Sequence, residues 1–137
     1  MGIVLRLLVA AGLAVDAYVH WIFAPDMANP DATGIGGDTL FRGQAVVAAL
    51  AAVLVLVLER WWTYAVAFLV AGSAVGALLF YHYFDPGALG PIPNMHDTTW
   101  YSEKVWCVVG EGIATVAALV GMLTVRASRR DPAPAGL

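Results

Sequence analysis

The chain has 137 residues, of which 61% are hydrophobic and 12% charged, and its formal net charge at pH 7 is −3. This length corresponds to one domain, and a soluble domain so small could not bury so much apolar surface, because its surface-to-volume ratio is high. The negative net charge argues against nucleic acid as a partner, since a phosphate backbone requires a basic surface. The composition therefore favours a protein whose solvent is the lipid bilayer.

Four apolar runs follow one another along the chain, over residues 3–24, 40–58, 61–83 and 101–125. Each reaches or approaches the roughly 20 residues that a helix needs to cross a hydrocarbon core. Backbone polar groups in lipid must be paired within their own segment, so runs of this kind predict transmembrane α-helices. The second and third runs are joined by a very short connection, which makes them antiparallel neighbours. We therefore expect an all-α, transmembrane four-helix bundle of up-down-up-down topology.

The bounds of the domain and its orientation in the membrane can also be predicted. Residues 1–130 are expected to form the single transmembrane domain, and the Pro- and Ala-containing tail, 131–137, to be disordered. Five arginines fall at one end of the predicted bundle, and the positive-inside rule makes that end cytoplasmic. We expect a multi-pass protein of a bacterial plasma membrane, with both termini cytoplasmic. The five residues are Arg6, Arg60, Arg126, Arg129 and Arg130.

Ionisable side chains within the predicted spans are the main functional signal, because placing them in a bilayer is costly. Asp16 and His20 are four residues apart, so they share one face of the first helix. Glu111 lies about 15 Å from the outer end of the fourth helix. All such residues except Arg6 fall in the outer half, which predicts a polar pocket that opens outward. The candidate pocket residues are Asp16, His20, Arg42, His82, Lys104 and Glu111.

Three interpretations of these residues stay open. Asp16 and Glu111 could be neutralised by Arg42 or Lys104 in a buried ionic clasp that fixes helix packing. The same two carboxyl groups could instead handle protons or ions. In each case an ionised Asp16 that faced lipid would be costly, so we expect Asp16 and His20 to face the interior, in a polar cluster with the second or fourth helix.

A metal or a haem is the third interpretation. His20, His82 and His96 lie on or near the outer face, among carboxylates and methionines. Imidazole with carboxylate suits zinc, and imidazole with thioether suits copper. The spacing matches no known metal motif. His20 and His82 end two helices at similar depth, so they could hold a b-type haem between them. The lone Cys107 excludes an internal disulfide.

The prolines and glycines predict two further features. Five prolines in the two outer loops forbid regular helix there, so we expect the second loop, 84–100, to fold over the bundle with Met95 or Ile92 packed on it. Gly72 and Gly76 are expected to let the third helix approach a neighbour closely. The prolines are Pro25, Pro30, Pro86, Pro91 and Pro93.

Three short segments carry a resemblance to known proteins. They are Asp16-Ala17-Tyr18-Val19-His20, Gly90-Pro91-Ile92-Pro93-Asn94-Met95 and Trp100-Tyr101-Ser102-Glu103-Lys104. Through them most of the chain resembles a group of uncharacterised, small four-span membrane proteins of actinobacteria. In outline it is also similar to DoxX-like four-helix membrane proteins. The resemblance implies a four-span fold and brings no activity, cofactor or site residue with it.

No motif in the chain identifies a reaction. Ser73 and Ser102 have no base beside them in the sequence, and the glycines near residue 35 lie in a loop rather than after a strand. The leading hypothesis is therefore a non-catalytic accessory or binding subunit that uses the outer pocket. Lipid is its surrounding, and a membrane-protein partner or a second copy of the chain is the expected kind of partner. The sequence identifies no cofactor.

Overall fold

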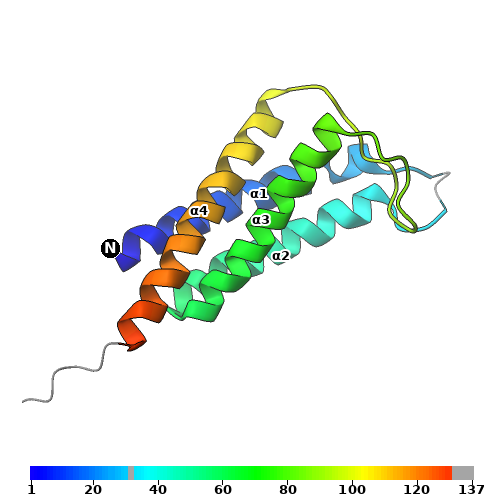
Figure 1. Ribbon diagram of the computed structural model, residues 1–137. Coiled ribbons are helices and arrows are strands. Elements are labelled where there is room, and N and C mark those ends of the chain that lie inside the picture. The colour runs from blue at the N-terminus through cyan, green and yellow to red at the C-terminus, as the bar shows by residue number, and fades with distance from the viewer. Residues whose placement is uncertain (31–32, 131–137) are drawn as a thin grey trace, which may run out of the picture.

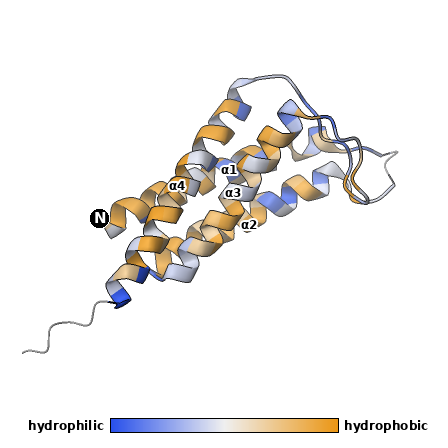
Figure 2. Ribbon diagram, in the orientation of Figure 1, coloured by the Kyte–Doolittle hydropathy of each residue, from blue (hydrophilic) through white to orange (hydrophobic). Residues whose placement is uncertain are grey.

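Four long apolar helices form in the computed structural model, which describes residues 1–30 and 33–130. All four are long and apolar enough to cross a membrane (Figures 1 and 2). The predicted all-α four-helix bundle is thus confirmed, and the expectation of a disordered tail falls on 131–137, outside the described residues. The elements are α1 (Gly2–Phe23), the short 3₁₀ helix η1 (Ala24–Met27), α2 (Gly37–Val57), α3 (Trp61–Tyr83) and α4 (Ser102–Arg130).

Two helix boundaries differ from the expected ones by more than one residue. Helix α2 begins three residues early, because Gly36 takes an extended conformation as N-cap and Asp38 places a negative charge in the first turn. Helix α4 continues five residues further than its apolar run, to Arg130. Its last turn contains Arg129 and Arg130, whose charges complement the negative end of the helix. Hydropathy alone marks the apolar span of a helix and misses such polar turns.

The helices alternate in direction, and each contacts the next along the chain, while α4 closes the bundle against α1 (Figure 1). Helices α1 and α3 are therefore diagonal to each other. Helix α2 packs less extensively on α3 than the other neighbours pack on one another. We call the two ends of the bundle the arginine end, with the five arginines named above, and the loop end, with the connections 28–36 and 84–101.

Small residues bring the helices together. Between lipid-facing helices there is no strong hydrophobic driving force, so close contact between backbones contributes more. A Cβ atom on Gly12 of α1 would lie 2.8 Å from the Cβ of Ala114, and one on Gly110 of α4 would lie 3.2 Å from the Gly12 carbonyl oxygen. Gly72 likewise faces Thr115 on α4, as expected, whereas a Cβ on Gly76 would meet open space, so the expectation for Gly76 is wrong.

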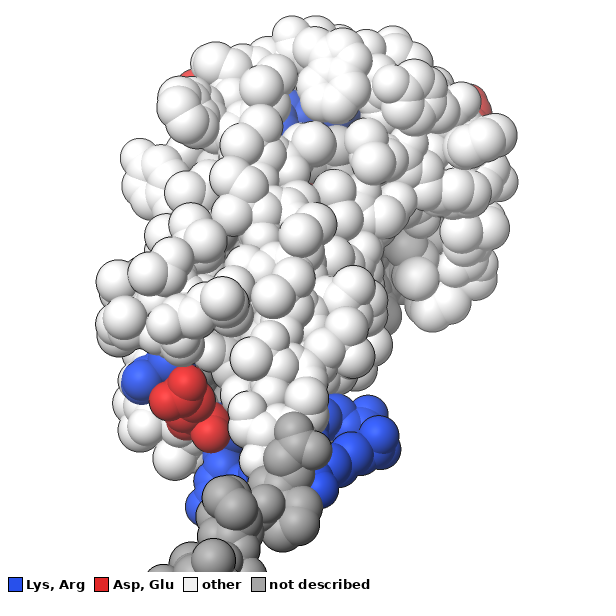
Figure 3. Space-filling view, turned by 60° about the vertical axis from the view of Figure 1, so that its left-hand side comes forward, with Lys and Arg blue, Asp and Glu red and all other residues white. Residues whose placement is uncertain are grey.

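Charged side chains close the arginine end. Arg6 donates to the carbonyl oxygens of Val55, at 3.0 Å, and of Leu56, where α2 ends, and it lies 3.9 Å from the Glu59 carboxylate. Arg126 lies over the ring of Trp61, 5.2 Å from its centroid. Figure 3 shows most of the blue Lys and Arg surface of this face at that end, with a smaller blue patch near the opposite end. The last four backbone carbonyl groups of a helix lack a partner within the helix, so donors such as Arg6 satisfy them.

The second loop covers the loop end. The Asp97 N–H donates to the Tyr81 carbonyl at 3.2 Å, and the Ile35 N–H donates to the Pro91 carbonyl at 2.9 Å, which joins the two loops. Ile92 and Met95 are partly buried against the bundle. In Figure 1 the loop runs from the end of α3 past the start of α2 and returns to α4. The prediction that this loop folds over the bundle is confirmed.

Candidate functional site

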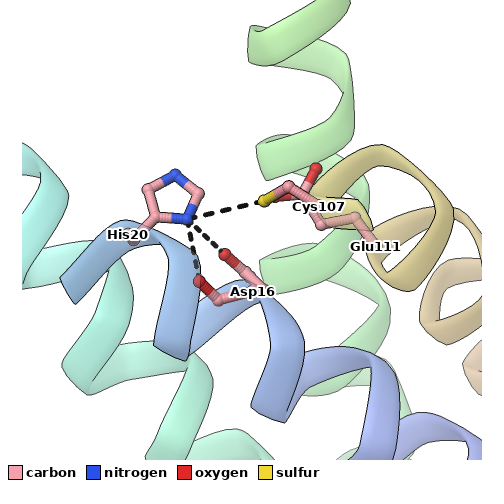
Figure 4. A group of neighbouring side chains, drawn as sticks. All are labelled: Asp16, His20, Cys107 and Glu111. Atoms are coloured by element: carbon pink, nitrogen blue, oxygen red, sulfur yellow. Dashed lines mark hydrogen bonds and ion pairs between the residues drawn. The ribbon is translucent and has the colours of Figure 1, made fainter. Parts of the chain in front are cut away.

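Four ionisable side chains meet inside the loop-end half of the bundle. Asp16 and His20 come from α1, and Cys107 and Glu111 come from α4 (Figure 4). Each residue offers one possible ligand atom (nitrogen, sulfur or oxygen), and these four atoms lie within 4.8 Å of one another. We call these four residues the polar cluster. The prediction that Asp16 faces the interior and joins groups from the second or fourth helix is confirmed.

Helix geometry explains why the cluster forms. Each helix contributes residues i and i+4, which lie one above the other on the same face. The two helices run in opposite directions, so His20 is opposite Cys107 and Asp16 is opposite Glu111. The backbone contact at Gly12 and Gly110 lies one turn or less from these carboxylates and holds the helices close enough for their short side chains to meet.

The contacts within the polar cluster are short. Nδ1 of His20 lies 2.6 Å from Oδ1 of Asp16 and 3.0 Å from the Asp16 carbonyl oxygen. The Cys107 thiol donates to Oε1 of Glu111 at 3.1 Å, and its sulfur lies 3.9 Å from Nδ1 of His20. Gln44 of α2 donates from Nε2 to the other oxygen of Asp16 at 2.8 Å. Three helices therefore hold the cluster in place.

The two carboxyl groups of the polar cluster are buried, so their negative charge needs compensation from a nearby proton or cation. Asp16 and Glu111 are both 0% exposed. Oε2 of Glu111 has no hydrogen-bond partner in the described part of the protein, and the contact of Asp16 Oδ1 with His20 is an ion-pair contact without hydrogen-bond geometry. Two ionised carboxylates this close repel each other strongly where little water enters. A proton or a bound cation must offset that charge.

A cavity of about 450 Å³ lies beside the polar cluster, and His20 and Cys107 are part of its wall. The cavity extends along the loop-end half between all four helices, and Ile92 and Met95 of the second loop line its outer end. Its remaining lining is mostly aliphatic and aromatic. These residues include Val19, Phe23, Met27, Leu40, Phe41, Ala77, Leu78, Tyr81 and Tyr101. The sequence predicted polar side chains here, and the structure adds a largely apolar space next to them.

A second polar group holds the loop over this cavity. The buried Lys104 ammonium donates to the carbonyl oxygens of Asp97, at 2.6 Å, and Thr99, at 3.1 Å, and lies 3.4 Å from the Asp97 carboxylate. It also lies 3.2 Å from Nδ1 of His82, whose ring packs on Trp100. Partial burial works against ionisation of Asp97, but the Thr99 N–H and the Lys104 ammonium outweigh it and hold the pKa of Asp97 below its ordinary value.

The six predicted pocket residues thus divide among three places. Asp16, His20 and Glu111 form the polar cluster, and His82 and Lys104 hold the loop. Arg42 lies elsewhere: its side chain is half exposed and pairs with Asp38 at 3.4 Å. The clasp of Asp16 or Glu111 with Arg42 or Lys104 is therefore wrong, because each cation has a nearer acidic partner in its own surroundings.

The three histidines also have separate surroundings. His20 belongs to the polar cluster, His82 contacts Lys104 and the Asp97 carbonyl, and Nδ1 of His96 lies 2.7 Å from the Tyr81 carbonyl. Both imidazoles of the haem pair considered above are thus engaged, with Asp16 in one case and with Lys104 and Trp100 in the other. This arrangement favours separate roles for the histidines over a shared metal or haem.

Two site residues were missed from the sequence. Cys107 was considered only as a disulfide partner, although it stands four residues before Glu111, the spacing that joins Asp16 to His20. Gln44 is an uncharged amide within an apolar run, which is itself a signal for a buried hydrogen bond. Both residues could have been found by extending the rule for buried ionisable groups to thiols and amides.

Comparison with models of protein families, with curated proteins and with solved structures finds no match to this chain. The functional argument therefore depends on the geometry of the cavity and the polar cluster.

Proposed function

We propose that this integral membrane protein is a non-catalytic binding protein that holds a neutral, mostly apolar small molecule in its loop-end cavity. The observation that carries the proposal is the cavity itself, of about 450 Å³ and with a mostly apolar lining. Small-molecule sites commonly measure about 300–1,000 Å³ and combine such a lining with a few polar groups that orient the ligand. Tyr81, Tyr101 and His20 supply polar groups in this wall.

A neutral occupant fits the charges around the cavity. Lys104 is paired with Asp97, and His20 contacts Asp16, so the charged side chains named in the wall already have partners. A charged ligand would have to displace one of these contacts or enter a low-dielectric space without a counterion. A molecule with an aliphatic or aromatic body and one hydroxyl or carbonyl group needs neither.

The route to the cavity points to the bilayer. Hydrogen bonds tie the second loop down, and its Ile92 and Met95 line the outer end of the cavity. Helices α2 and α3 pack less extensively than the other neighbours, and Ser73 and Ala77 of α3 line the cavity and are exposed. We infer that the ligand enters sideways from the lipid, between α2 and α3. The arginine distribution supports a cytoplasmic arginine end, with the loop end on the opposite side of the membrane.

A photoactivatable fatty alcohol tests this proposal, because it is neutral and has an apolar chain. The full-length protein in lipid nanodiscs is irradiated with a diazirine-bearing fatty alcohol, and the labelled residues are mapped by mass spectrometry. We expect saturable labelling of cavity residues such as Met27, Leu78 and Met95, suppressed by an excess of the unlabelled alcohol. The substitution Ala77→Phe, which places a ring in the cavity wall at the proposed entrance, should abolish this labelling.

The matched control is Ala49→Phe, which introduces the same ring at an exposed position of α2 outside the cavity wall. It should leave the labelling of the cavity unchanged. Uniform, non-saturable labelling of lipid-facing side chains, such as Leu50 and Leu69, with none in the cavity, would refute the proposal.

A further inference from the structure

We propose that the polar cluster binds one divalent transition-metal ion of the zinc class, with Asp16, His20, Cys107 and Glu111 as ligands. The ion would join α1 to α4 at the floor of the cavity. This inference is independent of the proposed small-molecule ligand, because four protein ligands complete a tetrahedral site without it. It rests on the chemistry, the spacing and the charge of the four side chains.

The spacing of the ligand atoms suits a tetrahedral ion. Zinc lies about 2.0–2.2 Å from nitrogen and oxygen ligands and about 2.3 Å from sulfur, so neighbouring ligand atoms are about 3.3–3.6 Å apart. In the polar cluster the three contacts between these residues measure 2.6, 3.1 and 3.9 Å, and all four ligand atoms lie within 4.8 Å of one another. Side-chain shifts of about 1 Å bring these separations to the tetrahedral values.

The charge of the cluster favours a cation. Asp16 and Glu111 are fully buried, and Lys104 and Arg42 are paired with Asp97 and Asp38. With a divalent ion, the two carboxylates and the Cys107 thiolate carry one net negative charge, less than the two of the metal-free carboxylates, while His20 binds as a neutral imidazole. The Cys107 thiol loses its proton to solvent as its sulfur coordinates. Oε2 of Glu111 is buried and has no hydrogen-bond partner in the described residues, and the bound ion would supply one.

A supporting contact fixes one ligand. Gln44 donates to Oδ2 of Asp16 and leaves Oδ1 facing His20. Metal-binding carboxylates are commonly oriented by such a hydrogen bond, whose loss lowers metal affinity by about 10–100-fold. This contact comes from α2, so the site is held by a helix that supplies none of the four ligands.

The kinds of ligand atoms select the metal. Calcium and magnesium prefer six or more oxygen ligands, whereas this cluster offers one nitrogen and one sulfur atom. Copper(I) prefers soft thiolate and thioether ligands, and two carboxylates are unsuitable for it. Zinc accepts imidazole, thiolate and carboxylate together, and cobalt(II) replaces it as a coloured probe.

The experiment uses the full-length protein without a polyhistidine tag, stripped of metal by a chelator and titrated with Co²⁺ and then Zn²⁺. We expect about one ion per chain and a thiolate-to-cobalt charge-transfer band, which Zn²⁺ abolishes. Cys107 is the sole cysteine of the sequence, so the band can come only from the polar cluster. The wild-type titration needs no variant and therefore does not depend on whether a variant folds.

Substitutions then assign the ligands. Cys107→Ser should remove the charge-transfer band, and Glu111→Gln should lower Co²⁺ affinity by at least about 100-fold, more than the loss of a supporting contact does. Gln44→Leu should lower it by about 10–100-fold. The matched control is Glu103→Gln, the same change two turns away on α4, where the carboxylate accepts a hydrogen bond from Ser102. It should leave the affinity unchanged.

A shared proton between Asp16 and Glu111 is the competing account of the cluster, and it predicts a different result. The wild-type protein would then give no charge-transfer band and retain no Zn²⁺. That outcome overturns the proposal, as does Co²⁺ binding that Glu111→Gln and Cys107→Ser leave unaltered. Neither result affects the small-molecule proposal, whose test measures labelling of the cavity.

Discussion

The two halves of the bundle pack their helices in opposite ways. In the arginine-end half the contacts are between alanines, Val9, Val55 and Tyr64, and Gly121 lies directly against the ring of Tyr64. A buried polar atom without a hydrogen bond in this half, the Tyr64 hydroxyl, carries no charge. In the loop-end half the helices surround ionisable side chains and a cavity. The arginine-end half therefore stabilises the fold through close packing. The loop-end half contains a cavity and buried ionisable side chains, which selection for close packing alone would not retain.

The largest expected effect belongs to the arginine-end half. In Gly121→Val the new Cβ would lie 2.8 Å from Cζ of Tyr64, a rigid ring that is 1% exposed. We expect the free energy of unfolding to fall by about 3 kcal/mol, at the upper end for overpacked cores. Thermal or denaturant unfolding in detergent measures it, and Co²⁺ affinity should not change.

The control for this prediction is Gly112→Val on the same helix, where a Cβ meets nothing within 4 Å. Its effect should stay below about 0.5 kcal/mol. If both variants lost the same free energy of unfolding, the effect would come from helix propensity and not from packing against Tyr64. The proposed contrast in packing between the two halves would then be wrong.

The next effect concerns the loop that covers the cavity. Lys104→Met keeps the aliphatic chain but removes the ammonium, so the Thr99 carbonyl oxygen and Oδ2 of Asp97 lose their donor and the Asp97 carbonyl oxygen keeps only its contact with His82. We expect a loss of about 2 kcal/mol, since hydrogen bonds to charged groups are the stronger ones. Protease cleavage within 84–100 should become faster.

Arg42→Met is the matched control, because the ion pair of Arg42 with Asp38 is half exposed, and exposed pairs contribute less than about 1 kcal/mol. It should leave the cleavage rate at its wild-type value. A loop that remains protected in Lys104→Met would show that Ile92 and Met95 alone hold it down.

A smaller effect on stability separates a binding site from a structural clasp. Asp16→Asn removes one of two neighbouring buried carboxylates, so in the metal-free protein we expect a change of less than about 1 kcal/mol, because repulsion and burial of charge are both relieved. Metal affinity should nevertheless fall sharply. If Asp16 were the partner of a buried ion pair needed for the fold, the loss would be about 3–5 kcal/mol. Unfolding with and without Zn²⁺ distinguishes the two.

The smallest effect is the pH dependence of the loop. The pKa of Asp97 is held below its ordinary value, so its contribution to stability is complete above the ordinary aspartate pKa, about 3.9, and is lost as the pH falls through the lower, folded value. Pepsin cleavage within 84–100, normalised to an unfolded substrate, should rise below about pH 4. His82 and Lys104 face the same loop, so Asp97→Asn is the comparison: its cleavage should already be faster above about pH 4 and should show no further rise at low pH.

Much of the fold could be predicted because lipid limits the possibilities. A run such as 61–83 has to be helical in a bilayer, and the short connection before Trp61 fixes its direction relative to α2. The interior position of Asp16 followed from the cost of placing a charge against lipid. These predictions depend only on whether a residue is stable in contact with lipid. They can therefore be made without knowing which helix packs against it.

The rest depends on contacts between helices. Arg42 could reach toward Asp16 or back to Asp38, and the local pair prevails because it stays near water and needs no desolvation. Cys107 became part of the site only once α4 was placed against α1 at Gly12 and Gly110. The cavity depends on the packing of side chains from all four helices and a loop, which spacing along one helix cannot predict.

The length of α4 has a consequence for how the protein sits in a bilayer of changing thickness. Its 29 residues make a helix about 43 Å long, whereas the hydrocarbon core measures about 30 Å. Because α4 is about 13 Å longer than the hydrocarbon core, the helix must tilt or extend among the lipid headgroups. Its last turns contain Arg126, Arg129 and Arg130. Guanidinium groups bind lipid phosphates, so they fix this end at the headgroup level. Hydrophobic mismatch is then taken up mainly at the opposite end, where thinning of the membrane would draw the headgroups toward the proposed entrance between α2 and α3.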